Sequence, residues 1–109
     1  MIYRLRELMR WKEVAKKIAE AAKEVLGDTE VYVVGGIAEG RFTAASDLDI
    51  LIVSDKVPST SKKIWLKVEI REKAFQKGVP LDYPLNLHMY NKKDFKEVKE
   101  YYKKMIRVD

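Results

Sequence analysis

Two aspartates and two glycines are the residues of this chain whose types and spacing best suit chemistry. Asp47 and Asp49 lie two apart in a run that predicts a β-strand, so both carboxylates should point to the same face. Carboxylates about 7 Å apart repel each other, and a divalent cation with oxygen ligands would explain why they coexist. Upstream, Gly35 and Gly36 follow another predicted strand, where backbone N–H groups can approach a phosphate. This combination predicts a site for a nucleoside triphosphate and Mg²⁺.

Each of these signals also has a simpler structural explanation. A Gly-Gly pair after a strand is commonly only a turn, and an Asp-x-Asp at the start of a strand is commonly a solvated edge or a cap. The spacing of the two features, with a predicted strand beside each, favours the nucleotide site over these alternatives.

The stretch from residue 35 to residue 50 resembles the signature of the minimal nucleotidyltransferases of the DNA polymerase β-like superfamily. That signature reads Gly-Ser-x-Ala-Arg-Gly, then several residues, then Ser-Asp-x-Asp followed by apolar residues. The positions that match it in register are Gly35, Ala38, Gly40, Ser46, Asp47 and Asp49. The resemblance covers most of the chain and extends to archaeal relatives, in line with an amide-poor, Lys/Glu-rich composition typical of thermophiles.

The resemblance implies transfer of a nucleoside monophosphate from a triphosphate to a hydroxyl acceptor. It assigns Asp47 and Asp49 as catalytic metal ligands that hold two Mg²⁺ ions. It also implies that four residues form the nucleotide-binding part of the site: Gly35, Gly36, Arg41 and Ser46.

The chain departs from the family signature at three positions. Gly36 replaces a serine that would contact the triphosphate, and Glu39 replaces an arginine, for which Arg41 is a possible substitute. The third departure concerns the third carboxylate, which the family supplies from the next core strand.

In this chain that strand spans residues 85–90, and Asn86 is the residue best placed opposite the aspartate pair. An amide ligates weakly and cannot act as a base. Asp82 is the rival for the third carboxylate, although it falls before Pro84 in the entering loop. His88 shares the polar face of the strand, where a histidine that is simply hydrogen-bonded is commoner than a ligand.

Hydrophobic periodicity predicts the elements that position these residues. Helical spacing covers residues 5–26, 59–77 and a last helix that Asn91 caps and whose apolar face continues to Met105. Short β-branched or apolar runs predict strands at 30–34, 47–53 and 85–90. The order α-β-(turn or helix)-β-α-β-α predicts one α/β domain over residues 1–109, with a small mixed sheet of three core strands and flanking helices.

The helix at 59–77 carries two apolar stripes. Ile64, Val68 and Phe75 form one, which we expect to face the sheet. The second is formed by Leu66, Ile70 and Ala74. We expect it to cover a partner or a second copy of the chain, unless another helix of the same chain covers it.

Composition narrows the function further. The 109 residues contain no cysteine and one histidine, which excludes disulfides and zinc–thiolate sites. The longest apolar run is four residues, so no membrane span is expected and a cytoplasmic location follows. The net charge of +5 comes from two basic flanks around a weakly acidic centre. These flanks mix lysine with glutamate and form no aromatic stacking platform between their basic residues, so nucleic-acid binding is the weakest hypothesis.

Two hypotheses remain. The first is a small Mg²⁺-dependent enzyme whose acceptor lies on another protein. The resemblance suggests a helical HEPN-type partner with a tyrosine hydroxyl. The second is a protein of the same fold that has lost the third carboxylate and only binds a nucleotide or a partner.

Overall fold

Three short runs of β-branched and apolar residues form the strands that the sequence predicts. In the computed structural model, which describes residues 2–41 and 43–109, these are β1 (Glu30–Val34), β2 (Leu48–Val53) and β3 (Leu85–Tyr90). β1 pairs antiparallel with β2, and β2 pairs parallel with β3. The chain crosses from β2 to β3 through a helix, as a parallel connection requires. The mixed α/β fold that the sequence predicts is therefore confirmed.

A fourth strand was not predicted. β4 (Ile106–Arg107) pairs antiparallel with β1 and completes a sheet of order β3-β2-β1-β4. Two residues carry too little alternation to predict a strand. This one forms because Tyr32 and Val33 of β1 present their free edge to the end of the chain.

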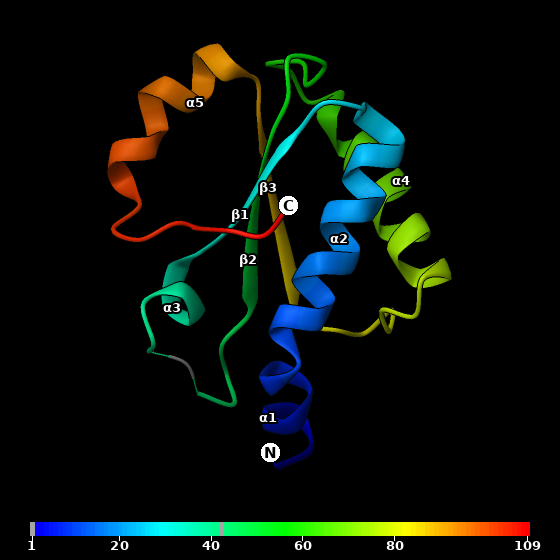
Figure 1. Ribbon diagram of the computed structural model, residues 1–109, viewed down its shortest axis with the longest axis vertical. Coiled ribbons are helices and arrows are strands. Elements are labelled where there is room, and N and C mark those ends of the chain that lie inside the picture. Colours follow the sequence, from blue (N-terminus) through cyan, green and yellow to red (C-terminus); the bar gives the residue numbers. More distant parts are fainter. Residues whose placement is uncertain (1, 42) are drawn as a thin grey trace.

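The main core lies between one face of the sheet and two helices, α2 (Trp11–Leu26) and α4 (Lys63–Gln76), which pack side by side (Figure 1). The helix predicted over 5–26 is divided at Arg10 into α1 (Ile2–Met9) and α2. Arg10 donates its N–H to the Glu7 carbonyl three residues back, which tightens the backbone at the junction. The inward face of α2 is buried as expected, with Ile18 fully enclosed.

The first stripe of α4 does not face the sheet, and for the second stripe the alternative of coverage by a helix of the same chain is confirmed. Ile70 and Ala74 are buried against the core, and Leu66 packs beside them. Ile64, Val68 and Phe75, which we expected to face the sheet, are 59%, 43% and 50% exposed. The second helix of the same chain, α2, therefore covers the Leu66–Ile70–Ala74 stripe, and no surface for a partner exists there.

The opposite face of the sheet carries α5 (Lys92–Val98). α3 (Gly35–Ala38) follows the end of β1 and packs Ile37 and Ala38 into the main core, and both helices lie away from α2 and α4 in Figure 1. A smaller apolar cluster on this face includes Val34, Leu51 and Val53. The last helix is shorter than expected, because after η1 (Lys99–Tyr101) the chain becomes extended. Tyr102 and Met105 still contact the smaller cluster, but from an extended segment. Among the described residues, no helix combines the length and apolar character needed to cross a membrane.

Candidate active site

The two aspartates lie where β2 begins, on the face of the sheet that carries α5. Asp49 is in the strand, and its neighbours Leu48 and Ile50 are buried on the opposite face. Asp47 precedes the strand and is exposed, while the Asp49 side chain is 26% exposed. Strand alternation therefore places both carboxylates together, as the sequence predicts.

Asn86 joins the two carboxylates. The parallel register pairs the Cα of Asp49 with that of Asn86. The Asn86 side-chain amide donates to Asp47 Oδ2 at 3.2 Å and to Asp49 Oδ1 at 3.4 Å. The residue opposite the aspartate pair is thus Asn86. The rival, Asp82, is exposed in the turn that precedes β3.

His88 also contacts the site, from the polar face where the sequence placed it as a hydrogen-bonded histidine, although the sequence did not identify Asp49 as its partner. Its Nε2 lies 3.2 Å from Asp49 Oδ1, and its side chain is 37% exposed. The alternation of side chains along β3 indicates this contact. Leu87 and Met89 are buried on the core face, so His88 points to the other face, together with Asn86. Asp49 therefore has polar partners from two successive outward positions of β3.

Gly35 lies directly beneath Asp49. Its φ of +73° is rarely adopted by L side chains, and an added Cβ would lie 2.5 Å from Asp49 Oδ2. Gly36 is tight as well, since its Cβ would lie 3.1 Å from the Arg41 carbonyl oxygen. The positive φ and the close approach to the Asp49 carboxylate therefore favour glycine at Gly35, whereas at Gly36 a side chain would need only a small shift of the Arg41 backbone. α3 begins immediately beside the aspartate pair.

The loop between α3 and β2 holds the remaining predicted residues. The Ser46 hydroxyl accepts a hydrogen bond from the Thr43 N–H at 2.9 Å and so shapes the turn that leads to Asp47. The exposed Arg41 guanidinium pairs with Glu39 Oε1 at 2.8 Å. This pair neutralises the Glu39 carboxylate, whose charge would otherwise oppose phosphate binding.

Tyr102 is a further residue near the site that the sequence placed on a helix. Burial raises its pKa to about 12, and a hydrogen bond with Tyr90 and the negative charge of Asp49 contribute to the shift. The extended segment after η1 thus brings a phenol over the site face. The helical spacing of the sequence does not predict this position, because the chain stops being helical after η1 and Tyr102 reaches the site from an extended segment.

The donor set suits a hard divalent cation that arrives with phosphates. Among the described residues, no three His, Cys, Asp or Glu side chains are placed to hold a metal ion by themselves. Mg²⁺ commonly uses one or two carboxylates and completes its shell with water and substrate phosphates. Asp47 and Asp49 provide the carboxylates, and the absence of a Cβ at Gly35 leaves room for one of them. The residues therefore fit Mg²⁺ bound together with a nucleotide.

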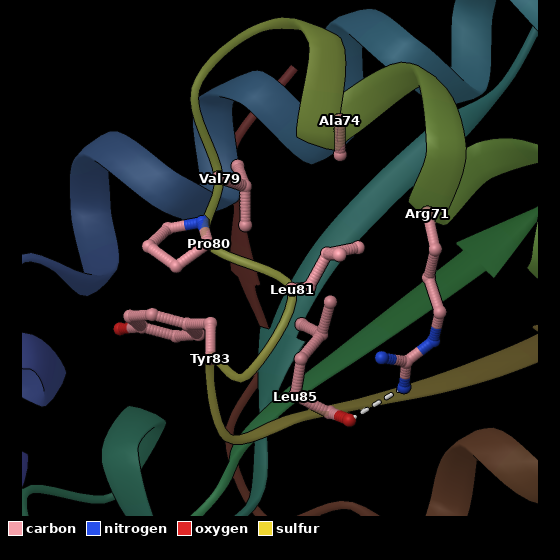
Figure 2. Close-up of a pocket in the computed structure, with 7 residues that line it drawn as sticks. All are labelled: Arg71, Ala74, Val79, Pro80, Leu81, Tyr83 and Leu85. Atoms are coloured by element: carbon pink, nitrogen blue, oxygen red, sulfur yellow. Dashed lines mark hydrogen bonds between the residues drawn. The ribbon is translucent and has the colours of Figure 1, made fainter.

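A separate hollow lies on the other face of the sheet. Figure 2 shows it between the end of α4 and the loop before β3, where Arg71 donates to the Leu85 carbonyl at 2.7 Å. Its lining is otherwise mainly apolar, with Val79 and Leu81 among the side chains. Because Leu85 and Asn86 point to opposite faces of β3, this hollow is distinct from the aspartate site.

Comparison with known proteins places these features in a family. A family model described as a nucleotidyltransferase domain matches residues 15–108. One solved structure, of a protein whose assignment as a nucleotidyltransferase is provisional, is 30% identical, with a TM-score of 0.55, over 86% of this chain and 96% of that one. A second, from Sulfolobus solfataricus and with the same provisional assignment, is 20% identical, with a TM-score of 0.59, over 95% of this chain and 84% of that one. The second likeness bears on the fold alone. No curated protein that we compared matches significantly.

Proposed function

We propose a function from one premise: the chain belongs to the family of nucleotidyltransferase domains. Family membership supports nucleotidyl transfer as the generic activity. More specifically, we propose transfer of a nucleoside monophosphate from a nucleoside triphosphate to a hydroxyl acceptor, with Mg²⁺ held at Asp47 and Asp49. The observation that carries this proposal is the Asp49 carboxylate, packed so closely on the backbone of Gly35 that a Cβ there would force it to move.

In the proposed reaction, the acceptor oxygen bonds to the α-phosphorus, and the bond from that phosphorus to the oxygen bridging to the β-phosphate breaks. Pyrophosphate leaves, and the hydroxyl proton passes to a base or to water. When bound, Mg²⁺ would neutralise phosphate charge and lower the pKa of the attacking oxygen. Transfer of this kind depends mainly on positioning and charge.

The chain's own residues supply that positioning. Asn86 contacts both carboxylates and fixes their separation, while His88 holds Asp49 from the neighbouring position of β3. The backbone at Gly35 and Gly36 would lie against the triphosphate, beside the carboxylates. Arg41, paired with Glu39, would have to exchange that partner to contact a phosphate. A hydroxyl on a helical partner protein remains our proposed acceptor.

A second candidate function rests on Asn86. An amide at this position provides no negative charge and no proton acceptor of useful basicity. The alternative is therefore a protein that binds the Mg²⁺–nucleotide complex through the same residues without transferring the nucleotidyl group.

Calorimetry with ATP, in the presence and absence of Mg²⁺, tests the binding that both candidates require. We expect Mg²⁺-dependent binding that Asp49→Asn abolishes. Asp55→Asn, which changes an exposed carboxylate paired with Lys92, serves as the matched control and should bind like the wild type. Binding that is independent of Mg²⁺, or equal in Asp49→Asn and the wild type, would contradict both candidates.

Release of pyrophosphate from labelled ATP, with candidate hydroxyl acceptors, then separates the two. Turnover by the wild type supports the enzyme. Nucleotide binding without turnover, together with activity gained by Asn86→Glu, supports the binding protein.

A further inference from the structure

The solvent face of α4 carries an apolar stripe that none of the described residues covers. The four side chains are Ile64, Trp65, Val68 and Phe75, and they are 43–73% exposed. Residues at this helical spacing lie along one side of the helix, opposite the buried Ile70. Single exposed hydrophobes are ordinary, but four on one side of one helix, two of them aromatic, are typical of an interaction surface.

The size of this stripe suits a dimer interface. With about 150–250 Å² for an aromatic side chain and less for aliphatic ones, the exposed fractions give roughly 400–500 Å² of apolar surface. A standard interface buries about 800 Å² per partner, of which about 65% is apolar in homodimers. The stripe therefore provides nearly all the apolar area that one partner contributes, and its charged margins would supply the polar rim.

The charges beside the stripe are arranged in a self-complementary way. Helical spacing places Lys67 and Arg71 along one margin. On the other side Glu69 lies beyond Trp65 and Glu72 is nearly in line with Trp65, so this side forms the acidic margin. Within the described part of the chain, none of these four side chains has an oppositely charged group within 4.0 Å, whereas several surface charges elsewhere are paired, for example Arg10 with Glu13.

The basic margin also carries an internal electrostatic cost. Partial burial lowers the pKa of Lys67, and the like charges of Lys63 and Arg71 lower it further. Lys63 and Arg71 are anchored to the carbonyls of Met89 and Leu85 at the edge of β3, so they cannot move far from Lys67. An acidic margin placed opposite would relieve this repulsion.

We propose that this stripe, formed by Ile64, Trp65, Val68 and Phe75, is the interface through which two copies of the chain associate. The charges select the orientation. A two-fold axis along the helices brings the basic margin of each copy against the acidic margin of the other, so the two α4 helices run parallel. An antiparallel pair would place basic against basic, and acidic against acidic.

The interface leaves both nucleotide sites open, because α4 covers the face of the sheet opposite Asp49 (Figure 1). The proposal therefore does not depend on the proposed function, and either can fail alone. Breaking the dimer is expected to leave Mg²⁺-dependent nucleotide binding unchanged.

Sedimentation equilibrium of the full chain tests the proposal. We expect a wild-type dimer that Val68→Glu weakens at least ~30-fold, the effect of losing a central interface residue. Tyr101→Glu places the same charge at a residue that is 82% exposed on η1, and it should not change the mass. Circular dichroism confirms that each variant folds, and Trp65→Ser is the second variant if Val68→Glu does not. A monomeric wild type at its highest soluble concentration, or a dimer that folded Val68→Glu leaves intact, overturns the proposal.

Charge reversal tests the arrangement within the dimer. Glu69→Lys combined with Glu72→Lys makes both margins basic and should weaken self-association at low salt. Adding an equimolar Lys67→Glu chain should restore association as a mixed dimer. If the Glu69→Lys, Glu72→Lys variant self-associates as strongly as the wild type, the parallel arrangement is overturned.

Because the chain contains no cysteine, Ser61→Cys provides a clean cross-linking site one turn before Trp65. Parallel helices bring the two copies of this position together, so oxidation should link the dimer covalently. A non-reducing gel that shows no linked dimer, when sedimentation shows a dimer, would contradict the parallel arrangement.

Discussion

Asp49 has more described contacts at the site than any other side chain, and each contact has a separate cause. The strand period turns it to the face of the sheet that carries α5, and the parallel register places Asn86 opposite it. His88 reaches it from two residues further along β3. Gly35 lies under it with a positive φ, and a Cβ there would lie 2.5 Å from Asp49 Oδ2 in its present position. The arrangement of the site is therefore built from backbone geometry more than from long side chains.

Replacing Gly35 by alanine isolates the contact with Asp49, because the chain offers a matched control. Gly35 and Gly40 have φ values of +73° and +74°, but a Cβ at Gly40 would meet nothing within 4 Å. Gly40→Ala should lose about 1 kcal/mol of unfolding free energy through backbone strain alone. Gly35→Ala should lose at least ~1 kcal/mol more, because Asp49 must move.

Urea denaturation measures these free energies, and calorimetry with ATP and Mg²⁺ measures binding. We expect Gly40→Ala to bind like the wild type and Gly35→Ala to lose binding. Equal destabilisation of the two variants, with binding retained in both, would show that the close approach at Gly35 has no role in the site.

At the level of secondary structure, α4 shows why helix periodicity alone did not identify its inner face. Both stripes have helical spacing, and the sequence offers no charge that distinguishes them. α2 decides between them by packing against Ile70 and Ala74, whose compact surface allows the helices to approach closely. The larger side chains are left on the outside.

Truncation on each side of α4 should give unequal losses of stability. Ile70→Ala removes methyl groups from a fully buried site and should cost about 2–5 kcal/mol. Ile64→Ala alters a side chain that is 59% exposed and should stay within about 0.5 kcal/mol of the parent. Chemical denaturation in a Val68→Glu background compares the two without a contribution from association. A larger loss from Ile64→Ala would mean that the faces of α4 are reversed.

At the scale of the whole molecule, the carboxyl end of the chain is fastened to the sheet through Asp109. Its side chain accepts hydrogen bonds from the Val31 N–H at 3.0 Å and from Arg107 Nε at 2.9 Å. Lys23 of α2 lies 3.7 Å away. Burial alone would raise the pKa of Asp109, but the hydrogen bonds and the two cations outweigh it and lower the pKa below its usual 3.8.

This shift makes a prediction about acid stability. A carboxylate whose folded-state pKa lies below its unfolded-state value stabilises the protein fully above the unfolded value and loses its contribution as the pH falls through the folded value. Asp109→Asn should therefore cost about 1–2 kcal/mol at neutral pH, since hydrogen bonds to a charged group are lost. The deficit should shrink below about pH 4, where the wild type also becomes protonated.

Thermal unfolding across this pH range provides the measurement. Asp28→Asn, at an exposed aspartate, is the control and should follow the wild type throughout. A deficit in Asp109→Asn that is constant with pH would mean that the ionised form of Asp109 contributes nothing to stability.

The sequence by itself determined the strands, the order of the elements and the face of the aspartate pair. These follow from local rules, because side-chain alternation and helical spacing are properties of neighbouring residues. It also identified Asn86 as the residue opposite the aspartate pair, because the alternation of apolar and polar side chains along residues 85–90 shows which residues share its face. The contact of His88 with Asp49 followed from the same alternation but was not drawn from it.

Only the tertiary structure decided the inner face of α4, the pairing of β4 with β1 and the position of Tyr102 beside the site. Each depends on contacts between segments far apart in the sequence. There the burial of apolar surface and the pairing of a free strand edge decide the structure, and the spacing of apolar residues along the chain does not. The same packing leaves Ile64, Trp65, Val68 and Phe75 exposed, on a helix whose two apolar stripes could not be distinguished by spacing alone.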